Sequence, residues 1–161
     1  MFLGATLALG AGCTSDPADV EGTYTLAVTN GKNECDFMPF AVGASASGIA
    51  MNVTQTGSDV TAAFGGSPLA TLVLDVWLND SKFVGSVDGN DLDLRITGSH
   101  AFNKGNCAYT YNARATATID GDILQGQIDY TAATNSNPDC GTLVGCHTVQ
   151  NFNGTRPPSA N

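Results

Sequence analysis

The sequence carries little charge, and most of that charge is negative. Of its 161 residues 13% are charged, with 6 Lys and Arg against 15 Asp and Glu, so the formal net charge is −9. Soluble domains usually contain about 25% charged residues. Nucleic-acid binding depends on clustered Lys and Arg that neutralise phosphates. The shortage of both therefore excludes a nucleic-acid partner.

Residues that favour surface helices are also scarce, because the chain has only two Glu and three Lys. These two residue types normally fill the solvent-facing side of helices. Gly is abundant, with 19 residues. The composition indicates an all-β protein, and the length fits a single domain with one core.

No apolar run reaches the roughly 20 residues that a membrane-spanning helix needs. The uncharged apolar run Met1–Leu9 instead fits the core of an export signal. The segment Gly10-Ala11-Gly12-Cys13 that follows resembles the lipobox of bacterial lipoproteins. This resemblance implies a signal peptide at residues 1–12, lipidation of Cys13 and attachment to a membrane through the lipid. The alternative is an ordinary secretory signal on a soluble periplasmic or secreted protein.

Thr14 follows the cysteine, where many lipoproteins retained at the inner membrane carry Asp. The resemblance therefore implies a bacterial cell envelope protein anchored in the outer membrane. We expect residues 13–21 to form a lipidated polar tether, residues 22–154 a single domain and residues 155–161 a disordered tail.

Most of the remaining chain alternates between apolar and polar residues with a period of two, which is typical of half-buried strands. Turn signals such as Asp88-Gly-Asn-Asp91 and Asp120-Gly121 separate these segments. For the most apolar run, 69–77, we favour a strand over a short helix. The predicted strands cover residues 22–29, 49–56, 59–64, 69–77, 82–87, 92–97, 107–119, 123–133 and 145–154.

About eight strands joined by short turns predict an antiparallel up-and-down meander in a closed or nearly closed barrel, with a β-sandwich as the alternative. The small residues Ala113, Ala115, Ala117 and Gly126 suit a crowded barrel interior. An integral outer-membrane barrel would need two aromatic girdles, and 7% aromatic residues do not supply them.

The predicted barrel is similar to lipocalin-like (calycin) barrels in two places. The first strand opens with Gly22-Thr-Tyr24, where that family has Gly-x-aromatic, and Arg156 follows the last strand. The resemblance implies that Arg156 packs across the end of the barrel near Tyr24. Two departures are the Tyr in place of the usual Trp and the position of Arg156 beyond the strand.

An exported chain is expected to oxidise its cysteines. With Cys13 lipidated, Cys35, Cys107, Cys140 and Cys146 remain, and four cysteines allow three pairings. The five residues between Cys140 and Cys146 close easily, which favours that pair and leaves Cys35 for Cys107. A metal site that uses these cysteines with His147 lacks the usual spacing.

Catalytic and metal motifs are weak. His100 and His147 are the two histidines, and no nucleophile elbow or comparable signature accompanies them. Asp88–Asp93 and Asp120–Asp122 contain clustered carboxylates, but hairpin turns explain them better than calcium does. We therefore predict no metal, no cofactor and no catalytic residue.

The longest connection, residues 30–48, contains Phe37, Met38 and Phe40. In a barrel it lies across one mouth, either as a ligand contact or as a plug, and we favour the plug. The sequence predicts a non-catalytic binding module for a small apolar ligand or an envelope partner. The alternatives are a structural or interaction protein with a filled barrel and, less favoured, a hydrolase-type enzyme.

Overall fold

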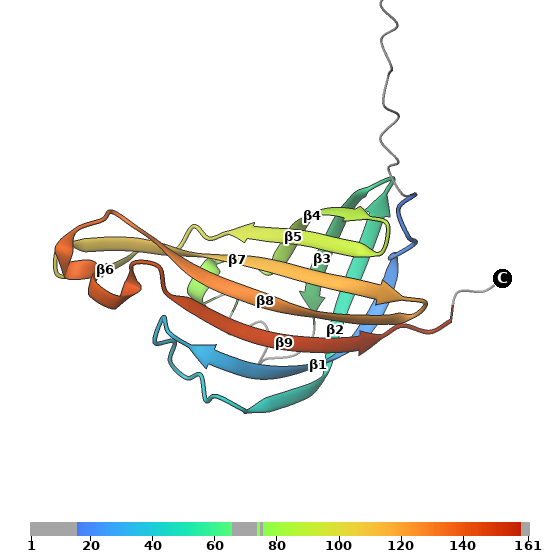
Figure 1. Cartoon of the computed structure of the whole chain (residues 1–161), viewed down its shortest axis with the longest axis horizontal. Coiled ribbons are helices and arrows are strands. Elements are labelled where there is room, and N and C mark those ends of the chain that lie inside the picture. The colour runs from blue at the N-terminus through green and yellow to red at the C-terminus, as the bar shows by residue number, and fades with distance from the viewer. Residues whose placement is uncertain (1–15, 66–73, 75, 159–161) are drawn as a thin grey trace, which may run out of the picture.

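The computed structural model describes residues 16–65, 74 and 76–158, and this part of the chain forms a closed antiparallel β-barrel (Figure 1). Eight strands form the ring in the order β1-β2-β3-β4-β5-β7-β8-β9, and β9 pairs with β1 to close it. The short strand β6 lies outside the ring and pairs with β7. The strands are β1 (Gly22–Asn33), β2 (Ser45–Thr56), β3 (Asp59–Gly65), β4 (Lys82–Asp88), β5 (Asp91–Thr97), β6 (Phe102–Lys104), β7 (Cys107–Asp120), β8 (Ile123–Thr134) and β9 (His147–Thr155). The predicted all-β meander and barrel are confirmed, and the sandwich alternative is wrong.

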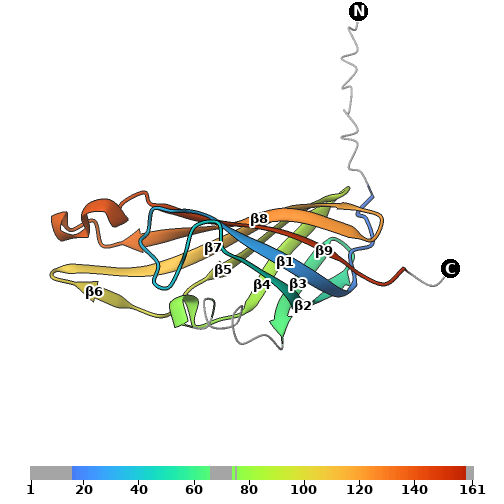
Figure 2. The ribbon, with the colours of Figure 1, turned by 90° about the horizontal axis from the view of Figure 1, so that it is seen from below.

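The two ends of the barrel differ in the length of their connections. The β2–β3, β4–β5 and β7–β8 turns have two residues each and lie at one end, which we call the closed end. Gly57, Gly89 and Gly121 in these turns have positive φ angles near 60°, a conformation that glycine adopts without steric cost. The longer connections gather at the opposite end, which we call the mouth (Figures 1 and 2).

The alternating pattern places apolar side chains inside the barrel. Ile49, Met51 and Val53 of β2 are at most 4% exposed, while the residues between them are exposed. Toward the closed end the interior is closely packed, and the space between Met51, Phe83 and Leu124 measures about 20 Å³. Gly126 is part of this close packing, since a Cβ there would lie 2.3 Å from the Thr116 carbonyl oxygen.

The apolar run at 69–77 is the clearest difference from the sequence prediction. Residues 69–73 and 75 lie outside the described residues, and residues 74 and 76–78 are helical, so the predicted strand is wrong there. Leu74, Trp77 and Leu78 follow the i, i+3, i+4 spacing of a helix face. Leu74 and Leu78 are 3% and 0% exposed, so this face packs onto the barrel interior.

The four cysteines form two disulfides at the mouth, but the predicted pairing is wrong. Cys35 bonds to Cys146, and Cys107 bonds to Cys140. Cys35 follows the end of β1, where Asn33 pairs with Thr148 of β9, so strand pairing brings it beside Cys146. Cys140 lies in the 3₁₀ helix η1 (Pro138–Leu143), which packs against β7.

The two bonds close loops with sequence separations of 111 and 33 residues. In the chain-entropy account such loops stabilise the fold by about 5 and about 4 kcal/mol. Proximity in sequence suggested the wrong partners because these disulfides join segments that only the barrel brings together.

The domain is longer than predicted at both ends. Ala18–Glu21, assigned above to the tether, cover the closed end: Val20 is 1% exposed, and its carbonyl accepts a 3.0 Å hydrogen bond from the Tyr24 hydroxyl. Gln55 accepts from the Val20 amide at 2.8 Å and donates to the Ala18 carbonyl at 3.0 Å. These bonds satisfy the backbone where the chain crosses the barrel end.

Arg156, assigned above to the disordered tail, is 9% exposed and also seals the closed end. Its guanidinium lies 5.7 Å from the centre of the Tyr24 ring, donates to the backbone carbonyls of Asp19 and Glu21, and bonds the Asp122 carboxylate at 3.0 Å. Arg156 thus packs across the barrel end near Tyr24, as the sequence resemblance implies.

We expect Arg156→Met to lower the free energy of unfolding by about 2–4 kcal/mol, because it leaves two carbonyls and a carboxylate without their charged donor. Urea unfolding followed by circular dichroism measures this change. The matched control is Arg95→Met, since Arg95 is an exposed arginine that pairs with Asp93 at 3.3 Å. That variant should change stability by less than about 1 kcal/mol, and equal losses in the two variants would contradict the sealing role.

Candidate functional site

Strand lengths leave the mouth of the barrel only partly walled. β1, β2, β7 and β8 contain 12–14 residues, whereas β3, β4 and β5 contain seven. The long strands therefore extend beyond the short ones at the mouth (Figure 2).

Phe37 is the centre of an aromatic cluster in this mouth. It is 1% exposed, stacks on Trp77 with ring centres 4.9 Å apart, and meets the edges of Tyr111 and Tyr130 at 4.6 and 5.5 Å. Phe40 is also buried, with 9% exposure. These two residues of the predicted mouth loop thus fill the barrel end as a plug.

Met38, the third residue of the predicted mouth loop, behaves differently. Its side chain is 72% exposed and lies at the edge of a cavity beside the plug. Val76 also lines the cavity and is 45% exposed. The loop thus supplies a plug through Phe37 and Phe40, and a rim through Met38.

The cavity has a volume of about 290 Å³, close to the lower limit of ordinary small-molecule sites. Its walls come from four ring strands, the loop after β1 and the helical turn at 76–78. Most of its lining is apolar. The lining residues are Val28, Asn30, Met38, Pro39, Ala44, Ser45, Ala46, Ile49, Leu74, Val76, Trp77, Ile128, Tyr130 and Gln150.

One wall of the cavity is polar and consists of a chain of hydrogen bonds. The Tyr130 hydroxyl donates to Gln150 Oε1 at 2.7 Å, Gln150 Nε2 donates to Asn30 Oδ1 at 2.8 Å, and Asn30 Nδ2 donates to the Ala41 carbonyl at 3.1 Å. Burial raises the pKa of Tyr130 well above its ordinary value, so this hydroxyl keeps its proton. Local sequence does not single out Tyr130, Gln150 and Asn30, because they share a wall only once β1, β8 and β9 pair.

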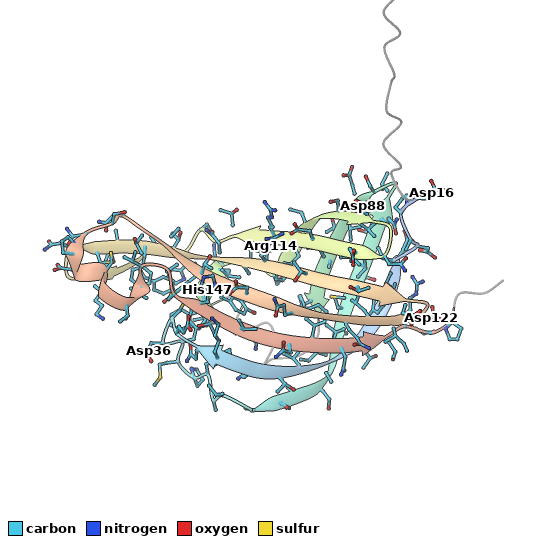
Figure 3. All side chains as sticks on the ribbon, in the orientation of Figure 1. Asp16, Asp36, Asp88, Arg114, Asp122 and His147 are labelled. Atoms are coloured by element: carbon cyan, nitrogen blue, oxygen red, sulfur yellow. A yellow bond between two sulfur atoms is a disulfide. The ribbon has the colours of Figure 1, made fainter. Side chains whose placement is uncertain are left out.

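The two histidines lie elsewhere. His147 Nδ1 is 2.8 Å from Asp129 Oδ2 on the outer surface, and its backbone amide donates to the Glu34 carboxylate at 3.2 Å (Figure 3). Strand register explains the pair, because His147 lies opposite Thr131, two residues from Asp129. His100 stacks on Phe102 with ring centres 4.4 Å apart. Neither histidine lines the mouth cavity.

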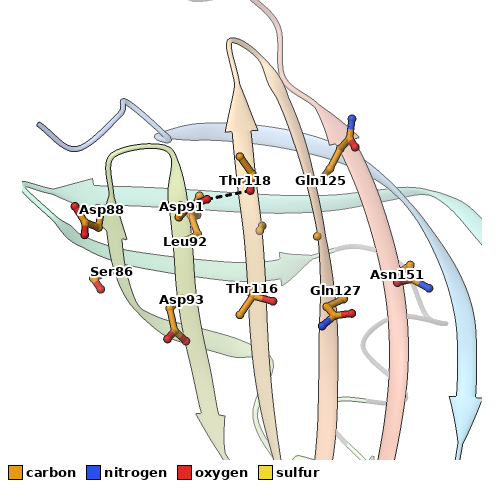
Figure 4. A pocket seen from close by; sticks show the side chains of 12 residues that line it. Ser86, Asp88, Asp91, Leu92, Asp93, Thr116, Thr118, Gln125, Gln127 and Asn151 are labelled. Atoms are coloured by element: carbon orange, nitrogen blue, oxygen red, sulfur yellow. Dashed lines mark hydrogen bonds between the residues drawn. The ribbon is translucent and has the colours of Figure 1, made fainter. Parts of the chain in front are cut away.

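Of the predicted turn carboxylates, Asp88, Asp91 and Asp93 border an open groove of about 590 Å³ on the outer face of the barrel (Figure 4), whereas Asp120 and Asp122 do not line it. Asp91 accepts a 3.0 Å hydrogen bond from Thr118. Arg114 contacts both Asp93 oxygens, at 2.9 and 2.7 Å. Within the described residues, no three acidic, histidine or cysteine side chains gather in a way that would hold a metal ion. We assign no function to this solvated groove.

Asp93 has the largest carboxyl pKa shift of the groove. Hydrogen bonds from Arg114, and next from Arg95, outweigh partial burial and lower its pKa to about 2. Since this folded-state pKa lies below the unfolded value, the ion pair stabilises the fold above about pH 4 and loses that effect as the pH falls toward 2.

We expect the Asp93 carboxyl to titrate near pH 2 in NMR measurements, and its midpoint to rise toward its ordinary value of 3.8 in Arg114→Gln. Lys104→Gln serves as a control, because it removes one positive charge from β6, which does not pair with β5. An unchanged Asp93 midpoint in Arg114→Gln would contradict the assigned cause.

Comparison with known proteins adds no family to these observations. Models of protein families, curated proteins and solved structures were compared with the chain, and none of them matches it. No helix in the described part of the chain is long and apolar enough to cross a bilayer. A barrel fold hosts many functions, so the functional inference depends on the mouth cavity and its chemistry.

Proposed function

We propose that this protein is a non-catalytic binding protein that takes up a small, largely apolar molecule in the mouth cavity. The observation that carries the proposal is an apolar space of about 290 Å³ with one polar wall, beside the closely packed core toward the closed end. Such a combination is typical of small-molecule sites, where apolar walls supply affinity and a few polar groups supply orientation.

Access to the cavity supports the same proposal. Met38 and Val76 give it an exposed apolar rim, so an apolar molecule meets favourable contacts before it enters. The two disulfides, Cys35–Cys146 and Cys107–Cys140, fix the connections at this end of the barrel. A site with fixed walls loses less entropy when a ligand binds.

Two further parts of the proposal come from the sequence. The lipobox-like segment ending at Cys13 supports an anchored lipoprotein of the bacterial cell envelope, and Thr14 in place of Asp after the cysteine favours the outer membrane. The eight-stranded ring and the contact of Arg156 with Tyr24 support a lipocalin-like barrel. The filled closed end supports the structural alternative, and the binding experiment below decides between them.

Binding is measured with N-phenyl-1-naphthylamine, a neutral apolar fluorophore. Trp77 is the only tryptophan of the chain and lines the cavity, so bound fluorophore should quench Trp77 emission by energy transfer. We expect Ala46→Phe to weaken binding at least tenfold, because the added ring occupies the cavity.

The matched control is Ala50→Phe on the same strand, since the Ala50 side chain is exposed and does not line the cavity. This variant should bind the fluorophore as the unaltered protein does. No saturable quenching in the unaltered protein, or equal binding by Ala46→Phe, would favour the structural alternative.

The anchor is tested separately, by expressing the full chain in a Gram-negative host. We expect the unaltered protein in the outer-membrane fraction, with an acyl mass increase on Cys13, and Cys13→Ser in the soluble fraction. Ser15→Ala is the control and should remain membrane-bound. An unaltered protein without acyl mass would overturn the lipoprotein assignment.

A further inference from the structure

The polar wall of the mouth cavity has a fixed hydrogen-bond direction. The Ala41 carbonyl can only accept, so Asn30 directs its Nδ2 toward Ala41 and its Oδ1 toward Gln150. Gln150 must then present Nε2 to Asn30, which leaves Oε1 for the Tyr130 hydroxyl. One backbone carbonyl thus sets the orientation of all three side chains.

The direction of these hydrogen bonds determines which donors and acceptors of the polar wall remain for a ligand. The Tyr130 proton is used in its bond to Gln150, so the hydroxyl oxygen is left as an acceptor. The Gln150 amide keeps one N–H and one oxygen lone pair, since each end of it makes one hydrogen bond within the described part of the chain. The wall therefore suits a group that both donates and accepts a hydrogen bond.

The described residues offer no charged partner for a ligand in the cavity. Among residues 16–65, 74 and 76–158, the lining includes no Asp, Glu, Lys, Arg or His side chain. A charged group moved from water into such a site loses hydration without gaining an opposite charge, which is strongly unfavourable. The chain's net charge of −9 further disfavours anions.

We infer that the mouth cavity binds neutral, mainly apolar molecules that carry one hydroxyl or amide group. This group forms hydrogen bonds with the amide of Gln150, which lies between Tyr130 and Asn30 in the polar wall. This inference rests on the proposed binding function and narrows it. Fatty carboxylates, organic phosphates and amines that are protonated at neutral pH are excluded as good ligands.

The test uses four compounds that share one naphthalene skeleton. They are 2-naphthalenemethanol, 2-naphthoate, 2-naphthylmethylammonium and 2-methylnaphthalene, and each competes with N-phenyl-1-naphthylamine at pH 7. We expect the alcohol to compete best, both charged compounds to be at least tenfold weaker, and the hydrocarbon to be several-fold weaker than the alcohol.

Variants of Gln150 connect this ranking to the polar wall. Gln150→Leu should remove the preference for the alcohol over the hydrocarbon, with each competitor measured against the fluorophore's own affinity for that variant. Gln150→Glu should make 2-naphthylmethylammonium the best competitor, because it adds the missing negative charge. Gln127→Leu on the outer face is the matched control and should leave the ranking unchanged, since Gln127 is exposed and lies outside the cavity.

The outcomes separate this inference from the proposed function. If the fluorophore binds but 2-naphthoate competes as well as the alcohol, or the hydrocarbon does, the ligand class is wrong while the binding function remains. If the fluorophore shows no saturable quenching of Trp77 in the unaltered protein, both the binding function and the ligand class fail. A ranking that is the same in Gln150→Glu and in the unaltered protein would also overturn the role of Gln150.

Discussion

The constraint on which the mouth depends is the unequal length of the strands that close the ring. A closed ring satisfies its backbone hydrogen bonds only where neighbouring strands run side by side. Beyond the ends of β3, β4 and β5, the longer strands β1, β2, β7 and β8 continue without a neighbouring wall opposite them. The inner faces of these extensions would be exposed to solvent unless other segments packed on them. The plug at Phe37, the helical turn at 76–78 and both disulfides are found at this end. The mouth cavity is the space that this cover leaves.

Much of the fold was predictable from local sequence, because two properties of strands are local. Alternating burial follows from the period of two, and short hairpins follow from glycine with positive φ, as at Gly89 and Gly121. The boundaries were less predictable. Nothing in the residues next to Val20 and Arg156 in the sequence indicates that either side chain is buried. Both are buried because they pack across the closed end of the barrel, which exists only in the folded chain.

The site was predictable only in part, since it is assembled from pairings distant in sequence. Phe37, Met38 and Phe40 were apparent as an apolar group in a long loop, but nothing local distinguishes a plug residue from a rim residue. Asn30 and Gln150 lie 120 residues apart and meet through the pairing of β1 with β9. Leu74, Trp77 and Leu78 lie on one helix face in a run that was predicted to be a strand. Such a short apolar run fits the helix period as well as the strand period, so the local pattern does not decide between them.

The placement of the chain ends has a consequence for how a ligand would arrive. The described chain enters at Asp16 and leaves after Arg156 at the closed end, so both ends lie far along the barrel from the mouth (Figures 1 and 3). A lipid on Cys13, three residues before Asp16, would hold the closed end near the bilayer and direct the mouth into the aqueous phase. A ligand would then be captured from solution, or handed over by another protein, rather than drawn sideways out of the lipid.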